Sequence, residues 1–165
     1  MSKHPFALKF SLALLEKEPM TLEGELPPEF LELEENEMLH AAGPVKYRLD
    51  AQMITGNVSV TGSLSCPIEG ECGRCLEPVT QTVAVKNLSL FYDELDELDE
   101  LDVTEDVRTE LLLALPMNLL CSPECKGLCP QCGANLNHGG CGCNTTEPAP
   151  PEEASPWNIL DGLGK

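Results

Sequence analysis

The fold is decided by residues 45–66, which read VKYRLDAQMITGNVSVTGSLSC. Apolar and polar side chains alternate in two runs, 45–53 and 58–66, and this period-two pattern is typical of strands with one buried face. The sequence Thr-Gly-Asn at 55–57, between the two runs, is a plausible turn. We therefore expect an antiparallel hairpin that packs one face on a core and exposes the other to water.

Segments on both sides of this hairpin extend the same pattern. Alternation over residues 6–14 predicts a strand, and a second short strand is expected at 20–26. The acidic segment 29–37 is expected to be a loop or a weak helix. Residues 79–92 predict a further strand, and its apolar positions change from odd to even numbers near Lys86–Asn87, which predicts a β-bulge there.

Residues 93–102 repeat the triplet Asp-Glu-Leu three times. A solvated, mobile linker is favoured over a calcium site or a docking strip for a basic partner, because a calcium loop needs carbonyl ligands and a glycine turn. Thr104 is then expected to cap a helix over 104–115 that Pro116 ends. The apolar face that this helix would pack on the sheet consists of Val103, Val107, Leu111 and Ala114.

These elements predict an α+β fold: a twisted antiparallel sheet of about five strands with one packed helix and a C-terminal cysteine-rich metal-binding segment. We expect residues 1–116 to form the antiparallel sheet domain with its helix, 117–144 a cysteine-rich zinc-binding segment, and 145–165 a flexible linker and tail helix. The tail carries the chain's one tryptophan, Trp157. It either docks back on the domain or serves as an anchor for a partner.

The composition indicates one globular core with a small appendage, since 42% of the 165 residues are hydrophobic. The chain has no apolar run of about 18 residues and its start lacks the features of a signal peptide, so a cytoplasmic protein without membrane contact is expected. With ten Lys and Arg and a formal charge of −18, direct nucleic-acid binding is not expected, because such binding depends on neutralising phosphates. A basic protein partner is favoured instead.

Six of the nine cysteines lie in residues 121–143, a segment with too few large apolar side chains to fold unaided. The sequence CPQCG at 129–133 is typical of a zinc knuckle, in which two thiolates of a tight turn bind one ion. The most economical set of four ligands is Cys129, Cys132, Cys141 and Cys143. Cys121 or Cys125 could replace one of them, and His138 is a lesser candidate. The alternatives are an iron–sulfur cluster, or a cluster of unligated or oxidised thiols.

A second cysteine feature lies between the expected strands, where Cys66 is followed by Cys72-Gly-Arg-Cys75. A Cys-x-x-Cys pair could be a redox centre, but redox folds place it at a helix N-terminus and here it lies in a hairpin loop. Metal ligation or a structural turn is therefore favoured. We hypothesise that Cys72 and Cys75 complete a second metal site with Cys121 and Cys125.

The sequence offers no catalytic constellation. It has no nucleophile motif, no glycine-rich phosphate loop and no metal-ligand set with an evident open position. Its three histidines, His4, His40 and His138, are scattered in segments expected to be loops or termini. We therefore expect a protein that is not an enzyme.

Three motifs follow one another along the chain: CGRCLEP at 72–78, ELLLALP at 110–116 and CKGLCPQCGANLN at 125–137. Taken together they resemble the YceD family, the large ribosomal RNA subunit accumulation proteins of bacteria, and the last motif is the most specific. The resemblance covers roughly residues 45–165. The tail reads Ser-Pro-Trp-Asn at 155–158, where the family pattern has Asp-Pro-Arg-Trp.

The resemblance implies a non-enzymatic cytosolic factor that is needed for normal 23S ribosomal RNA accumulation and acts in large-subunit biogenesis. Because the chain is strongly acidic, we expect it to act by contacting a ribosomal protein or an rRNA processing or assembly factor. The rival interpretation is a thiol redox or metal-handling protein that uses Cys72, Cys75 and the C-terminal cysteines. A weaker third interpretation is a regulated adaptor whose Trp157 tail binds the partner.

Overall fold

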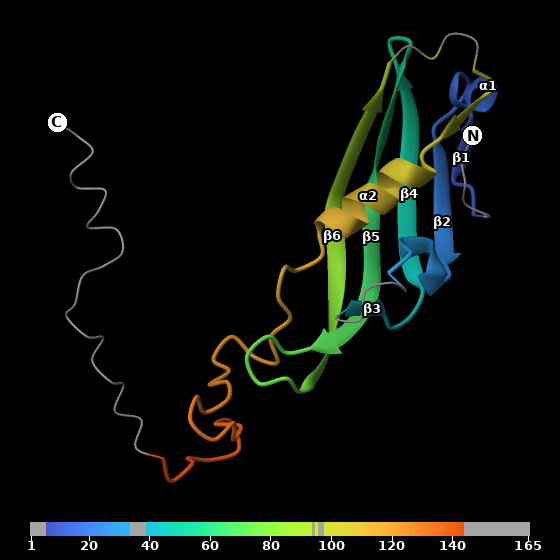
Figure 1. Ribbon diagram of the computed structural model, residues 1–165. Helices are drawn as coiled ribbons and strands as arrows, with labels where there is room; N and C mark the ends of the chain where they lie inside the picture. Colours follow the sequence, from blue (N-terminus) through green and yellow to red (C-terminus); the bar gives the residue numbers. More distant parts are fainter. Residues whose placement is uncertain (1–5, 34–38, 94, 96–97, 144–165) are drawn as a thin grey trace, which may run out of the picture.

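A computed structural model of the chain describes residues 6–33, 39–93, 95 and 98–143. Figure 1 shows a long antiparallel sheet with helix α2 crossing one face, and the cysteine-rich segment beyond one end of the sheet. The predicted linker and tail helix at 145–165 lie outside the described residues, as does most of the second half of the acidic segment 29–37.

The main sheet has five antiparallel strands: β2 (Met20–Leu26), β3 (Leu39–Ala41), β4 (Val45–Ile54), β5 (Asn57–Glu71) and β6 (Pro78–Tyr92). Strand β5 is its centre, because β4 and β3 pair with successive parts of β5 while β6 pairs with it almost from end to end. Strand β2 pairs with the far edge of β4. The predicted α+β class, with about five strands, is confirmed.

The turn of the central hairpin is made by Thr55 and Gly56, because Ile54 pairs directly with Asn57. Both turn residues have positive φ, 49° and 87°, as in the two-residue turns whose twist matches that of the flanking strands. The turn is therefore one residue shorter than the three predicted from the sequence.

The predicted β-bulge in β6 is confirmed. Gly62 pairs with Leu88 and Leu64 pairs with Val85, so one residue of β5 lies opposite the two residues Lys86–Asn87. Gly62 also approaches β4 closely: a Cβ at this position would lie 2.1 Å from the backbone carbonyl oxygen of Arg48. A side chain cannot be accommodated without moving that backbone, so glycine is required.

The first strand is shorter than predicted. Strand β1 (Lys9–Ser11) is followed at once by helix α1 (Leu12–Leu15), so the predicted strand over 6–14 is wrong from residue 12 onward. Leu12 and Leu15, three residues apart on one face of the helix, are both buried, while Leu14 is 47% exposed. Over so few residues the apolar positions fit both a strand and a short helix, so their periodicity did not distinguish the two structures.

The acidic repeat also contains a strand. Strand β7 (Glu100–Asp102) pairs with β1 in a separate two-stranded antiparallel sheet, so the prediction of a solvated linker is wrong for these three residues. Leu101 is buried there, and Glu100 forms an ion pair with Lys9 at 3.1 Å. The partner of Leu101 in this pairing is Phe10, 91 residues earlier in the chain, so the local sequence cannot reveal the strand.

Helix α2 (Thr104–Leu113) confirms the predicted helix and ends two residues earlier. The predicted cap is wrong, because Val103 occupies the N-cap position and Thr104 is fully buried. The Thr104 hydroxyl donates to the Asp102 carboxylate and accepts a 2.9 Å hydrogen bond from the Leu8 N–H. The Asp102 carboxylate also accepts from the Thr104 N–H at 3.1 Å, and so satisfies a free donor of the first turn.

A short 3₁₀ turn, η1 (Pro28–Leu31), lies against α2. Arg108 of α2 donates to the backbone carbonyls of Phe30 at 3.1 Å and Leu31 at 3.2 Å, and forms an ion pair with Glu32 at 2.7 Å. The side chains of Phe30 and Leu31 are fully buried. A short helical element at the start of the acidic segment thus helps to cover the core.

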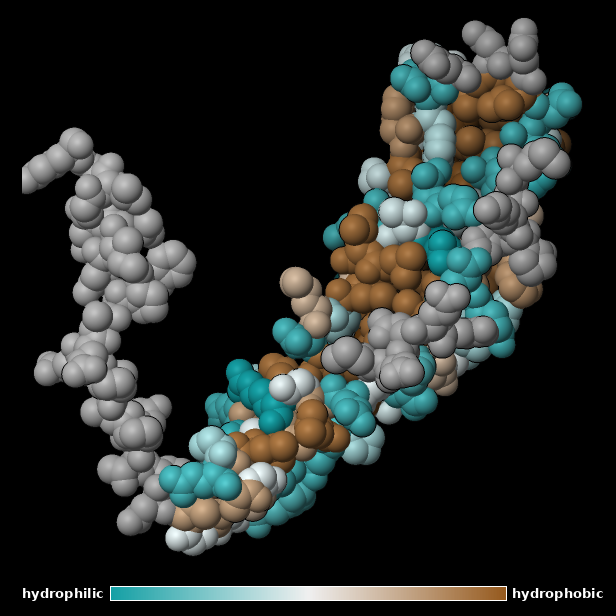
Figure 2. Space-filling view, in the orientation of Figure 1, coloured by the Kyte–Doolittle hydropathy of each residue, from teal (hydrophilic) through white to brown (hydrophobic). Residues whose placement is uncertain are grey.

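One hydrophobic core lies between the sheet and the elements that cover it. Its fully buried large side chains are Phe10, Phe30, Leu31, Leu49, Ile68, Leu111, Val45, Val58, Val60, Val103 and Val107. The predicted helix face is confirmed except for Ala114, which is exposed. Figure 2 shows hydrophobic residues gathered on the face where α2 lies. Leu113, the last residue of this helix, and Met117, four residues later, are 76% and 99% exposed. Within the described residues, no helix is long and apolar enough to span a membrane.

Thr104→Val should lower the free energy of unfolding by about 1–3 kcal/mol, because it leaves the buried Leu8 N–H without its acceptor and removes the hydroxyl that donates to the Asp102 carboxylate. Chemical denaturation measures this loss. Thr109→Val, at an exposed position of the same helix, is the matched control and is expected to change stability little. Equal stability of the two variants would contradict the assignment.

Candidate metal centre

The loop between β5 and β6 forms a tight turn that carries Cys72 and Cys75. The Cys72 N–H donates to the Glu77 carbonyl at 2.8 Å, and the Leu76 N–H donates to the Cys72 carbonyl at 2.9 Å. Leu76 has a φ of 61°, a left-handed conformation that leucine rarely adopts. This turn fixes both thiols at the end of the longest hairpin of the sheet.

The chain after α2 returns to this turn. The Gly73 N–H donates to the Leu119 carbonyl at 2.8 Å, and Arg74 Nη1 donates to the carbonyls of Cys125 at 3.0 Å and Pro123 at 3.3 Å. Gly127 packs so closely that a Cβ there would lie 3.1 Å from the Arg74 carbonyl oxygen. The cysteine-rich segment is therefore held against the β5–β6 loop, beyond the end of the sheet (Figure 1).

Four sulfur atoms meet where the two segments touch, and we call Cys72, Cys75, Cys121 and Cys125 the first thiol group. Their Sγ atoms all lie within 4.8 Å of one another. The Cys75–Cys121 and Cys72–Cys125 Sγ distances are 3.6 and 3.8 Å, too long for disulfide bonds. Four sulfurs each about 2.3 Å from one tetrahedral ion are separated by about 3.8 Å, so the spacing fits a single ion.

The surroundings of the first thiol group favour some thiolates over others. Backbone N–H groups of Cys121 and Arg74 lower the pKa of Cys72 to about 6. The Asn137 side-chain amide, which donates to Cys125 Sγ at 3.2 Å, is the main cause of the lowered pKa of Cys125. The Glu77 N–H lowers the pKa of Cys75, but burial and the neighbouring thiols outweigh it and raise this pKa to about 12. Without a cation, four thiolates therefore cannot coexist here.

The second thiol group consists of Cys129, Cys132, Cys141 and Cys143, whose Sγ atoms also lie within 4.8 Å of one another. The turn at 129–134 is closed by two 2.8 Å hydrogen bonds, from the Gly133 N–H to the Cys129 carbonyl and from the Cys129 N–H to the Ala134 carbonyl. Gly133 has a φ of 72°, which glycine adopts without strain. The predicted knuckle has the expected turn geometry.

The second thiol group shows the same division of pKa values. Backbone N–H groups of Cys132 and Gln131 lower the pKa of Cys129 to about 6. The Cys132 thiol and burial raise the pKa of Cys143 to about 12, and the Cys129 thiol is the main cause of the raised pKa of Cys141. Each group therefore contains at least one thiol that loses its proton readily and others that would lose theirs only when a cation binds.

The structure brings together both sets of four that the sequence suggested. Cys121 and Cys125 lie with Cys72 and Cys75, so neither replaces a member of the second thiol group. Cys66 lies apart from both groups, buried in the sheet, and burial raises its pKa. His138 Nε2 is 2.5 Å from Glu77 Oε1, so the structure places this lesser candidate against a carboxylate.

The contacts of three residues around the thiols were not predicted from the sequence. Asn137 and His138 lie within the span of the second thiol group but contact Cys125 and Glu77 of the first region, and Arg74 joins the two segments by its carbonyl contacts. His138 was considered only as a lesser candidate for a metal ligand. The one available signal for Arg74 and Asn137 was their presence in the cysteine motifs at 72–78 and 125–137.

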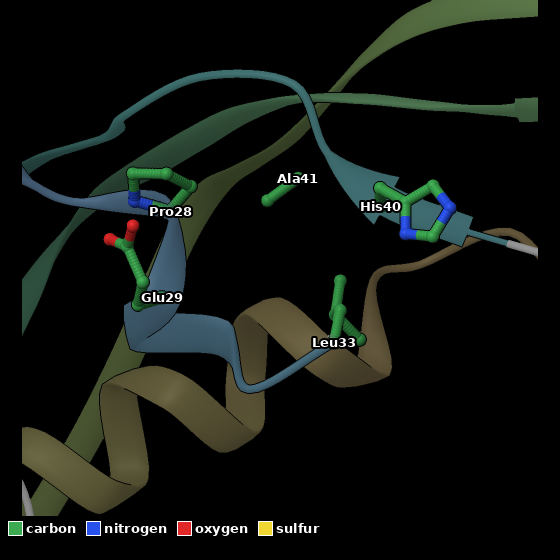
Figure 3. Close-up of a pocket in the computed structure, with 5 residues that line it drawn as sticks. All are labelled: Pro28, Glu29, Leu33, His40 and Ala41. Carbon is green, nitrogen blue, oxygen red and sulfur yellow. The ribbon is translucent and has the colours of Figure 1, made fainter. Parts of the chain in front are cut away.

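A cavity of about 200 Å³ lies near η1 and β3, away from the thiols, and is lined by Pro28, Glu29, Leu33, His40 and Ala41 (Figure 3). Within this described lining there is one carboxylate and one imidazole, and neither Ser nor Cys accompanies them.

Comparisons with known proteins extend this description. A family described as large ribosomal RNA subunit accumulation protein YceD matches residues 60–164. An uncharacterized protein of Mycobacterium tuberculosis is 39% identical over 102 residues, which are 53% of this chain and 49% of that protein. One of Mycobacterium leprae is 28% identical over 129 residues, 69% of this chain and 56% of that protein.

A plant relative carries a descriptive name. The chloroplastic large ribosomal RNA subunit accumulation protein YCED homolog 1 of Arabidopsis thaliana is 37% identical over 46 residues, 28% of this chain and 14% of that protein. The chain spans about half the length of the mycobacterial relatives. No solved structure matches it.

The fold and the two thiol groups define an α+β protein whose antiparallel sheet is joined to a cysteine-rich segment that could hold metal ions. The family match covers more than half of the chain, including both thiol groups. The chain belongs to the YceD family, whose name implies a role in the accumulation of large-subunit ribosomal RNA.

Proposed function

We propose that this chain is a non-enzymatic, cytoplasmic factor for 23S ribosomal RNA accumulation or processing, in which two zinc ions fix the cysteine-rich segment to the sheet. The observation that carries the metal assignment is the gathering of eight thiols into two groups of four, each within 4.8 Å. The ribosomal role rests on membership of the YceD family.

The donor sets favour zinc. Four thiolates around one ion form the closed tetrahedral site that zinc takes in structural centres, with no position left for substrate. In an iron–sulfur cluster, cysteines on different iron atoms lie far apart, whereas all four Sγ atoms of each thiol group lie within 4.8 Å of one another, as around a single ion. Bound zinc would supply positive charge to the thiolates, and the eight cysteines would act as its ligands.

The charge of the chain supports a role through protein contacts. A formal charge of −18 repels phosphates but attracts the basic proteins that ribosome assembly involves, so the partner is a ribosomal protein or an rRNA processing or assembly factor. The exposed basic side chains Lys46 and Arg48 of β4 are paired with Glu25 and Glu23 of β2, at 3.4 and 3.7 Å. These pairs leave little positive charge there for an RNA backbone.

A thiol redox or metal-handling role is the second candidate, because the pKa of Cys72 is lowered to about 6. The arrangement supports ligation better than redox exchange. Cys72 is fully buried, whereas a redox thiol must be reached by its substrate. The backbone N–H groups that lower its pKa are of the kind that also lowers the pKa of Cys129 in the knuckle.

Purified full-length protein should contain two zinc ions per chain, measured by elemental analysis against protein concentration. Cys72→Ser/Cys75→Ser and Cys141→Ser/Cys143→Ser are each expected to lose one ion, because each removes two ligands from one thiol group. Cys66→Ala, which changes a thiol outside both groups, is the control and should retain two. A single zinc that persists in the Cys72→Ser/Cys75→Ser variant would contradict the assignment.

Depletion of the protein in cells that encode it should lower 23S relative to 16S ribosomal RNA, measured on total RNA. Re-expression of the wild-type chain is expected to restore the ratio, whereas the Cys72→Ser/Cys75→Ser variant, with the segment released from the sheet, should restore it poorly. A 23S to 16S ratio that depletion leaves unchanged would count against the ribosomal role.

The zinc-loaded protein alone should not bind 23S RNA fragments in gel shifts at about 0.15 M salt, because its charge repels phosphates at distances up to the Debye length of about 8 Å. A basic RNA-binding protein run in parallel is the positive control. Tight, salt-sensitive binding of 23S fragments by the isolated chain would refute action through protein contacts alone.

A further inference from the structure

The loop between the two halves of the second thiol group reaches across to the first. Asn137 lies in this loop, at 133–140, and its Nδ2 donates to Cys125 Sγ at 3.2 Å while its Oδ1 accepts from the Lys126 N–H at 2.8 Å. The next residue, His138, contacts Glu77 of the β5–β6 loop at 2.5 Å. A segment that belongs to one thiol group thus supplies hydrogen bonds around the other.

The shape of this loop is fixed from within the second thiol group. Cys132 and Cys141 hold its two ends, since both belong to one set of four sulfurs. The Leu136 N–H donates at 2.9 Å to the carbonyl of Gly127, which lies between the two thiol groups, and the Asn137 N–H donates to Asn135 Oδ1 at 2.9 Å within the loop. Closure of the second thiol group fixes both ends of the loop and so limits where the Asn137 amide can lie.

We infer that metal binding at the two thiol groups is cooperative, and that Asn137 is the positioning residue through which the second group strengthens the first. A hydrogen bond to a ligating atom holds that ligand in place for the metal, so the Asn137 amide would keep Cys125 Sγ beside the other three sulfurs of the first thiol group. Closure of the second thiol group orders the loop and brings this donor to Cys125. The inference rests on the proposed binding of metal at both groups.

The structure predicts how strong the coupling is and which thiol group binds its metal first. Hydrogen-bond partners of metal ligands typically change metal affinity by about 10- to 100-fold when they are removed. Equilibrium coupling is reciprocal, so each group strengthens the other by the same factor. The first thiol group joins cysteines 46 and 53 residues apart, whereas the second is local, so its shorter loop closes at lower entropic cost and it fills first.

The test measures zinc affinity by competition with a chromophoric chelator on the full-length chain. Asn137→Ala should weaken zinc binding at the first thiol group about tenfold. Cys141→Ser/Cys143→Ser, which leaves only the first group, should weaken it by at least the same factor. Combining Asn137→Ala with that double variant should produce little further loss, because the donor is already misplaced.

Two further variants separate hydrogen bonding from a general effect on folding. Asn137→Asp keeps an oxygen acceptor for the Lys126 N–H but removes the donor to sulfur, so it should weaken the first group at least as much as Asn137→Ala. Asn118→Ala, at an exposed amide that precedes Cys121, is the matched control and should leave both affinities unchanged. Circular dichroism of each variant should retain the sheet signal.

The outcomes distinguish this inference from the metal assignment on which it rests. Two zinc ions per wild-type chain, with affinities that stay the same in Asn137→Ala and Asn137→Asp and at the intact thiol group of each double-cysteine variant, would overturn the coupling and leave the two sites standing. Fewer than two zinc ions in the wild-type chain would overturn both. If the losses of zinc affinity at the first thiol group are fully additive in the combined variant, Asn137 is not the residue that couples the two groups.

Discussion

The pairing of β5 with three other strands is the constraint on which the rest of the structure depends. Its fifteen residues pair with β4 and β3 along one edge and with β6 along the other, while Val58, Val60 and Ile68 point into the core. A slip by one residue would turn all of these side chains to water, so the alternating pattern fixes the register. The bulge opposite Gly62 then adjusts the phase of β6 without breaking that register.

The position of the cysteine-rich segment follows from this ladder. The turn that joins β5 to β6 carries Cys72 and Cys75, so the longest hairpin of the sheet presents two thiols at a fixed place. Helix α2 is anchored by Val107 and Leu111 in the core, and the chain that follows it reaches the turn at Leu119, whose carbonyl accepts from the Gly73 N–H. The cysteine-rich segment has almost no core of its own. It is held to the β5–β6 turn by backbone hydrogen bonds, by Arg74 and by the packing of buried cysteines.

The local sequence was sufficient to predict those features of the fold that depend on neighbouring residues alone. The alternation in 45–66, the phase change at Lys86–Asn87 and the knuckle at 129–133 each carry their cause within a few residues, and the structure agrees with all three. Strand β7 depends on a distant partner, and the burial of Thr104 depends on Leu8, so neither could be read locally. The sets of four thiols followed from cysteine spacing, whereas Asn137 acts through a contact that only the folded chain creates.

The first thiol group also bears on the unfolded chain. Cys75 and Cys121 are 46 residues apart, and the loop between them contains β6, β7 and α2. An ion that joins these cysteines restricts the unfolded ensemble as a covalent cross-link would, and chain-entropy arguments give about 4 kcal/mol of stabilisation for a loop of this length. That is a large part of the stability of a typical domain. Helix α2 carries no cysteine, yet its resistance to unfolding would rise and fall with the occupancy of this site by a metal ion.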